Sequence, residues 1–129
     1  MKKRYLIILA NYYKDISDGL LKSAEKDLPK LSIIKKIIVP GVFEIPVTIA
    51  KNIKKFDAFI ALGCVIKGQT PHFDFISKAS TEALMKLAVE NKKPIGNGII
   101  TCLNRKQALE RKNKGGEAAK AVISVLSQS

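Results

Sequence analysis

Four nearly continuous apolar runs, each followed by an amphipathic segment, most constrain what this chain can fold into. The runs cover residues 5–10, 33–39, 58–66 and 95–102. An apolar run without a helical period is typical of a strand that is buried on both faces, as strands of parallel sheets are. We therefore predict four parallel strands with helices on both sides of the sheet.

The segments between these runs predict helices. Asp15 or Ser17 can cap a helix that extends to about residue 28. Further helical patterns cover residues 43–53, 71–90, 107–111 and 116–126, with a break at 112–116. The apolar residues expected to pack from the second and third helices are Ile45, Val47, Ile49, Ala50, Phe75, Ala79, Ala83, Leu84, Leu87 and Ala88. Right-handed crossovers then give an α/β protein, a three-layer α/β/α sandwich with residues 1–129 as a single domain.

The charge of the chain favours some partners over others. The formal net charge is +12, and lysines scattered along the chain carry most of it. No cluster of arginine, lysine and aromatic residues is present, so we expect no nucleic-acid binding and instead attraction of phosphorylated metabolites. Cys64 and Cys102 lack metal-ligand spacing and are expected to be buried thiols. No run is long enough to span a bilayer, so a cytoplasmic protein without membrane contact is expected.

Ligands of open parallel sheets bind at the carboxyl ends of the strands. Four segments occupy that edge in the predicted fold, at residues 11–14, 40–44, 67–72 and 97–101. These four segments are therefore expected to hold the functional residues.

The segment at residues 62–72 carries the strongest local signal. Thr70 is a good N-cap and Pro71 suits a first helical position, so the free N–H groups of the helix start could bind a phosphate. Ordinary capping explains the same residues equally well. His72 is the only histidine and follows in the first turn. The positive end of the helix should keep its imidazole neutral, which suits proton transfer.

The other edge segments offer binding groups. Glu44 follows a Pro-Gly turn and could either cap a helix or accept hydrogen bonds from hydroxyls and amines. Tyr12 and Tyr13 follow the first strand, and either ring could stack on a flat ligand or simply pack. Two glycines flank Asn97 and permit close approach of a ligand to the backbone.

Two long motifs resemble the lumazine synthase family. Residues 40–46, PGVFEIP, resemble the PGAFEIP signature of that family, and residues 62–75 resemble its LGxVIxGxTxHxDxV segment. Arg111 and the NKG at 113–115 are similar to its ER…NKG ending. The motifs occur in the family's order along essentially the whole chain.

The resemblance implies a transferase of riboflavin biosynthesis. It would condense 5-amino-6-(D-ribitylamino)uracil with 3,4-dihydroxy-2-butanone 4-phosphate to 6,7-dimethyl-8-ribityllumazine, releasing phosphate and water, with no metal and no cofactor. Proton transfer would belong to His72. The pyrimidine and its ribityl chain would contact Tyr12, Val42, Phe43, Glu44, Cys64, Val65, Ile66 and Asn97. The phosphate substrate would contact Gln69, Thr70 and Arg111, with Lys114 as a further candidate.

The resemblance also implies flavodoxin-like strand order and a pentamer whose active sites lie between subunits. Asn97 and Arg111 would then reach into the pocket of a neighbour. Many members have an aromatic residue in place of Asn97, a longer segment between Arg111 and Lys114, and an extension before the first strand. Without that extension we expect a pentamer or a pair of pentamers rather than an icosahedral shell. Riboflavin synthase is a further candidate partner.

Three other functions compete with this interpretation. A flavin- or pterin-binding module on the same fold would need neither the histidine nor the phosphate loop. A pentameric riboflavin synthase would act on lumazine, which carries no phosphate. A basic nucleic-acid-binding protein would show strongly salt-dependent affinity for oligonucleotides.

Overall fold

The computed structural model describes residues 2–128 as a sheet flanked by helices. Within these residues, no helix is both long enough and apolar enough to cross a membrane. The elements in chain order are β1 (Arg4–Ala10), α1 (Lys14–Asp27), β2 (Ile33–Val39), the 3-10 turn η1 (Val42–Glu44), α2 (Ile45–Asn52), β3 (Ala58–Ile66), α3 (His72–Asn91), β4 (Ile95–Cys102), α4 (Arg105–Glu110) and α5 (Lys114–Leu126).

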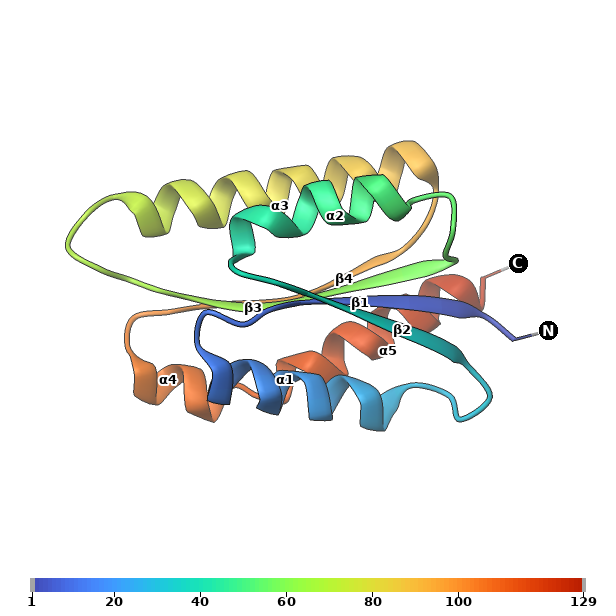
Figure 1. Cartoon of the computed structure of the whole chain (residues 1–129), viewed down its shortest axis with the longest axis horizontal. Helices are drawn as coiled ribbons and strands as arrows, with labels where there is room; N and C mark the ends of the chain where they lie inside the picture. The colour runs from blue at the N-terminus through green and yellow to red at the C-terminus, as the bar shows by residue number, and fades with distance from the viewer. Residues whose placement is uncertain (1, 129) are drawn as a thin grey trace.

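The sheet is parallel throughout and has the strand order β2-β1-β3-β4. Helices α2 and α3 cover one face, and α1, α4 and α5 cover the other (Figure 1). The predicted three-layer sandwich with flavodoxin-like order is confirmed. The order reverses between β1 and β3: the chain passes from β1 to β2 in one direction across the sheet, and from β3 to β4 in the opposite direction. Such a reversal opens a crevice at the carboxyl ends of the strands.

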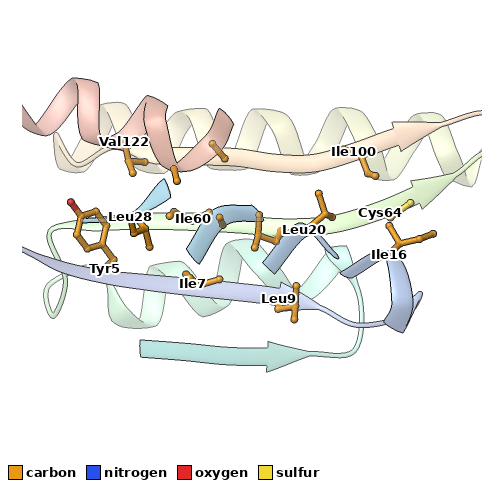
Figure 2. Packing of buried hydrophobic residues seen from close by; sticks show 14 of the residues in the cluster. Tyr5, Ile7, Leu9, Ile16, Leu20, Leu28, Ile60, Cys64, Ile100 and Val122 are labelled. Carbon is orange, nitrogen blue, oxygen red and sulfur yellow. The ribbon is translucent and has the colours of Figure 1, made fainter. Parts of the chain in front are cut away.

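Side chains of the central strands alternate between two buried clusters. On β1, Tyr5, Ile7 and Leu9 face α1 and α5, as Figure 2 shows for this cluster. Leu6 and Ile8 pack against α2 and α3 instead. Both faces of β1 and β3 are therefore covered, which explains why these strands are apolar without alternation.

Strand β2 departs from the prediction that every strand is buried on both faces. It forms one edge of the sheet, and only Val39 at its end is buried. Ile33, Ile34 and Ile38 are exposed on the single chain. The two lysines in the middle of the strand fit an edge position, where charged side chains discourage unwanted strand pairing.

The apolar faces of α2 and α3 are partly different from those predicted. Ile45 and Ile49 of α2 are buried as expected, but Val47 and Ala50 are exposed. On α3 the buried residues are Ile76, Ser80 and Leu84, while the predicted Phe75 and Ala79 are exposed. The helix turns a stripe of period four toward the sheet, so one of two adjacent apolar residues must face outward.

The starts of two helices also differ from the sequence prediction. α1 begins at Lys14, and neither predicted capping residue caps it, because the Ser17 hydroxyl donates to the Ala10 carbonyl inside the protein. α3 begins at His72 with Pro71 at the N-cap position, one residue later than predicted. Thr70 therefore lies outside the helix.

The predicted break at 112–116 is shorter than expected, because Gly115 and Gly116 lie inside α5. A β-carbon at Gly115 would collide with the backbone carbonyl of Leu20 in α1. The Gly116 N–H donates to the Ser23 hydroxyl at 2.8 Å. These glycines therefore let α5 approach α1 closely rather than ending the helix.

Candidate active site

A cavity of about 320 Å³ opens at the point where the strand order reverses. It is bounded by the ends of β1 and β3, by η1 and by the first turn of α3. Its lining residues are Tyr12, Tyr13, Gly41, Val42, Phe43, Cys64, Val65, Ile66, His72 and Ile76. Three of the four predicted edge segments therefore meet in one pocket.

The floor of this pocket comes from strand β3. Cys64 and Val65 are buried and Ile66 is half-buried, because β3 lies between β1 and β4 and emerges only at its end. The two tyrosines after β1 stand at the side. Tyr12 is 76% exposed, so its ring is free to contact a ligand, whereas Tyr13 packs against the buried cluster under α1. The pocket thus combines an apolar base with an exposed aromatic ring.

His72 lies at the mouth of the pocket as the first residue of α3. Its backbone N–H donates to the Thr70 hydroxyl at 3.4 Å, a long contact that leaves this donor weakly used. Gln69 and Thr70 are exposed in the loop before the helix and do not line the pocket. The His72 imidazole nevertheless lies next to the N-terminus of α3, because His72 is the first residue of that helix.

Turn η1 closes the opposite side of the pocket. Val42 points into the core, while Phe43 is 74% exposed at the rim. Glu44 is half-buried and is not among the lining residues. Its Oε1 oxygen lies close to Gly41, where a β-carbon would come within 3.3 Å of it. Since Gly41 lines the pocket, the Glu44 carboxylate lies next to a lining residue without lining the pocket itself.

A second cavity, of about 640 Å³, lies along the free edge of β4. It holds three further predicted residues, Asn97, Arg111 and Lys114, and it shares no residue with the first pocket. Its full lining is Thr81, Asn97, Ile99, Ile100, Thr101, Glu110, Arg111, Asn113, Lys114 and Glu117. A single chain therefore does not join these residues and His72 in one cavity.

The polar side chains of the second cavity have only weak or local partners. The Arg111 guanidinium donates to the Thr101 carbonyl at 3.4 Å. Asn97 accepts a hydrogen bond from the N–H of Ile99 at 3.0 Å. Lys114 lies 3.8 Å from the Glu117 carboxylate. An exposed guanidinium with one long hydrogen bond keeps most of its donors for another anionic group.

The thiol on the floor of the first pocket is neutral at physiological pH. Burial, with a smaller contribution from nearby Cys102, raises the pKa of Cys64 to about 12. Both cysteines are free and buried, as predicted. Within residues 2–128 no group of three His, Cys, Asp or Glu side chains could hold a metal ion. Cys64 therefore offers the pocket a compact apolar surface rather than a nucleophile.

Several lining residues were not singled out from the sequence. Ile76 follows His72 by four residues and shares its helix face, a signal that helical periodicity could have supplied. Gly41 lies inside the PGVFEIP motif at residues 40–46. Thr81 and Glu117 come from helices that flank the β4 edge, and no local pattern marks either of them.

Comparison with known proteins agrees with these motifs. The family model for 6,7-dimethyl-8-ribityllumazine synthase matches residues 2–129. A protein of that name from Bartonella tribocorum is 45% identical over 134 residues, covering 97% of this chain and 89% of its own. The Agrobacterium fabrum synthase is 42% identical, with coverages of 97% and 93%, and that of Corynebacterium kroppenstedtii is 41% identical, with 93% and 80%. The chain thus belongs to the 6,7-dimethyl-8-ribityllumazine synthase family.

Proposed function

We propose that the pocket at the β1–β3 reversal binds the pyrimidine substrate of lumazine synthesis and that His72 transfers the protons of the reaction. The observation that carries this proposal is the common pocket of seven residues expected from the family resemblance. They are Tyr12, Val42, Phe43, Cys64, Val65, Ile66 and His72. The Glu44 carboxylate lies next to Gly41 of this pocket, and it would accept hydrogen bonds from the ribityl hydroxyls.

The family's reaction in riboflavin biosynthesis needs little beyond positioning and proton transfer. The amine of the pyrimidine attacks the ketone carbon, water leaves, and an imine forms. Loss of the C3 proton then gives an enamine, from which phosphate departs at C4. The resulting enol at C3 becomes a ketone, and the second amine attacks this ketone and closes the ring with loss of water. An imidazole at the pocket mouth can accept and return the protons of these steps. Holding both substrates together supplies the rest of the acceleration.

The phosphate of the second substrate would bind at the start of α3. Free N–H groups of a helix start and its positive dipole end favour an anion. Gln69 and Thr70 lie in the loop immediately before this start, beside His72. Arg111 would complete the site with a charge-assisted pair that stabilises the leaving phosphate. Lys114 lines the same cavity as Arg111 and is a second candidate cation.

Arg111 and Asn97 would reach this site from a neighbouring copy of the chain. The separation of the two cavities supports that arrangement, because neither cavity holds all the groups that the reaction needs. Exposed apolar side chains supply surface for such an assembly, and they include Phe43, Val47, Phe75, Met85 and Val89 on η1, α2 and α3. We propose a pentamer or a pair of pentamers, with the active site between subunits.

The proposed setting follows from the same properties. A single domain over residues 1–129 would work in the cytoplasm on small phosphorylated and ribitylated metabolites. Two buried free thiols fit a reducing compartment. Riboflavin synthase, which would consume the product, is a candidate partner.

The test combines the purified protein with both substrates and records lumazine fluorescence and phosphate release together. We expect the two signals to rise in parallel and to require both substrates. Omission of either substrate is the control. Absence of lumazine would refute the proposal, and riboflavin formed from lumazine alone would favour a riboflavin synthase instead. Sedimentation of the same sample gives the number of subunits.

A further inference from the structure

The start of α1 carries both tyrosines of the first pocket, yet no side chain caps it. Tyr13 occupies the N-cap position and makes no side-chain capping hydrogen bond. Helix starts are usually held by Ser, Thr, Asp or Asn at this position, and their loss weakens the helix end. Another contact must therefore fix the place where Tyr12 and Tyr13 stand.

Inside the protein, the Ser17 hydroxyl donates to the Ala10 carbonyl. At the surface, a second contact comes from α4, which lies beside α1 on the same side of the sheet (Figure 1). The Arg105 guanidinium, through Nη2, donates to the Asp15 carboxylate, across 90 positions of sequence. The hydrogen bond from Arg105 holds the pKa of Asp15 below its usual range, so the carboxylate is ionised at neutral pH. Both side chains are about half exposed, at 52% and 53%.

The α4 end of this contact is itself firmly held. The Asn104 side chain caps α4 by accepting from the N–H of Gln107 at 2.9 Å. The Gln107 side chain accepts in turn from the N–H of Leu103 at 2.8 Å. Ala108 anchors the helix in the buried cluster. Arg105 therefore projects from a fixed turn, and its contact can set the position of the first turn of α1.

The position of the start of α1 affects the exposed ring of Tyr12 through Tyr13. Tyr13 packs against the buried cluster, and the two rings meet edge to face with centroids 4.9 Å apart. Burial is the main cause that raises the pKa of the Tyr13 phenol, and the charge of Arg105 opposes this rise. The guanidinium thus lies within electrostatic reach of the tyrosine pair.

We propose that Arg105 is a positioning residue, which with Asp15 fixes the start of α1 and so orients the Tyr12 ring over the pyrimidine-binding pocket. This inference rests on the proposed function, because it takes the pyrimidine as the occupant of that pocket. Neither Arg105 nor Asp15 lines the pocket, so both act through the tyrosines.

The test compares Arg105→Ala with Lys106→Ala, which removes the adjacent cation of α4 and none of the ion pairs found within residues 2–128. We expect Arg105→Ala to raise the KM for the pyrimidine roughly threefold, the scale of an exposed ion pair. The kcat and the KM for the ketone phosphate should stay unchanged. Asp15→Ala should raise the KM for the pyrimidine to the same extent as Arg105→Ala, and the double variant should have a KM no higher than that of either single variant.

Salt provides an independent readout. The pyrimidine substrate carries no charge, so screening should raise its KM in the wild type by weakening the ion pair and should leave Arg105→Ala unaffected. A reversed pair, Asp15→Arg with Arg105→Asp, should restore the wild-type KM. Additive effects of the two single variants, or equal KM values in Arg105→Ala and Lys106→Ala, would overturn the inference.

A wild-type protein that forms no lumazine would refute the proposed function without deciding this point. Near-ultraviolet circular dichroism decides it separately, because the chain has three tyrosines and no tryptophan. We expect the tyrosine signal to change in Arg105→Ala and to remain in Lys106→Ala. An unchanged signal in both variants would show that the ion pair does not orient the rings.

Discussion

His72 and Arg111 open onto different cavities of the same chain. His72 stands at the start of α3 beside the β1–β3 reversal, while Arg111 follows α4 along the free edge of β4. The proposed reaction needs an imidazole and an anion-binding guanidinium at one substrate. The separation of the two residues within a chain therefore leads to a direct test of a shared site.

Mixing two impaired variants should restore activity if neighbouring subunits share each site. In a ring of identical head-to-tail contacts, each active site would take His72 from one subunit and Arg111 from its neighbour. His72→Ala and Arg111→Ala each remove one of these two groups, so random co-assembly leaves about a quarter of the sites with both groups. Co-refolding the variants in equal amounts and measuring turnover per chain provides the measurement. Refolding each variant alone is the control, and no gain on mixing would show that Arg111 does not complete the site of a neighbouring chain.

Removal of the imidazole should slow turnover without abolishing it. General acid–base catalysis typically contributes about 100-fold or more, so His72→Ala should lose kcat on that order while substrate positioning persists. Steady-state kinetics with each substrate varied separates the two effects. A large rise in the KM for the ketone phosphate with unchanged kcat would instead assign His72 to phosphate binding.

The ring of Tyr12 should matter more than its hydroxyl. Tyr12→Phe keeps the aromatic face and should retain a near-normal KM for the pyrimidine. Tyr12→Ala removes the face and should raise that KM by roughly tenfold, the scale of an aromatic contact near 1.4 kcal/mol. Equal effects of both substitutions would show that a hydrogen bond from the phenol, rather than stacking, holds the ligand.

The contact between α1 and α5 should be intolerant of a single methyl group. Gly115→Ala would place a β-carbon against the Leu20 backbone carbonyl, which cannot rotate away as a side chain could. We expect a loss of about 1–3 kcal/mol in the free energy of unfolding, measured with urea. Gly68→Ala is the matched control, because nothing lies within 4 Å of its added β-carbon. Equal stabilities would mean that the helices separate without cost.

Alkaline conditions should destabilise the protein partly through Cys64. The thiol ionises near its ordinary pKa of 9.0 in the unfolded chain, whereas burial raises the pKa to about 12 in the fold. The unfolded state therefore loses its proton first, and stability falls as pH rises from 9 toward 12. Urea unfolding at pH 8 and pH 10 should show a smaller loss in Cys64→Ala than in the wild type. An identical loss in both would contradict this role.

Local patterns in the sequence predicted the sheet and much of the first pocket. Strands β2, β3 and β4 have the bounds that their apolar runs indicate. Burial on both faces explains the unbroken apolar run of β3, whereas β2 and β4 lie at the edges of the sheet and expose some of their residues. The motif residues from Cys64 to His72 follow one strand into one helix, so they stay together in space.

Features that depend on distant contacts could not be predicted in this way. Asp15 pairs with Arg105, which lies 90 positions away in the sequence, and Gly115 lies where α5 packs closely against Leu20 of α1. No short window of sequence contains either pair. The exposure of Phe75 could not be predicted locally either, because it depends on the neighbouring Ile76, rather than Phe75, facing the sheet.

The cavity along the free edge of β4 determines which assemblies of the chain have complete active sites. Under the proposed arrangement, two subunits that meet head to tail form one complete active site and leave one incomplete site at each end of the pair. Only a closed ring leaves no incomplete site, so a ring has more complete active sites per subunit than any open assembly. Dilution that opens the ring should therefore cost activity before any helix or strand unfolds.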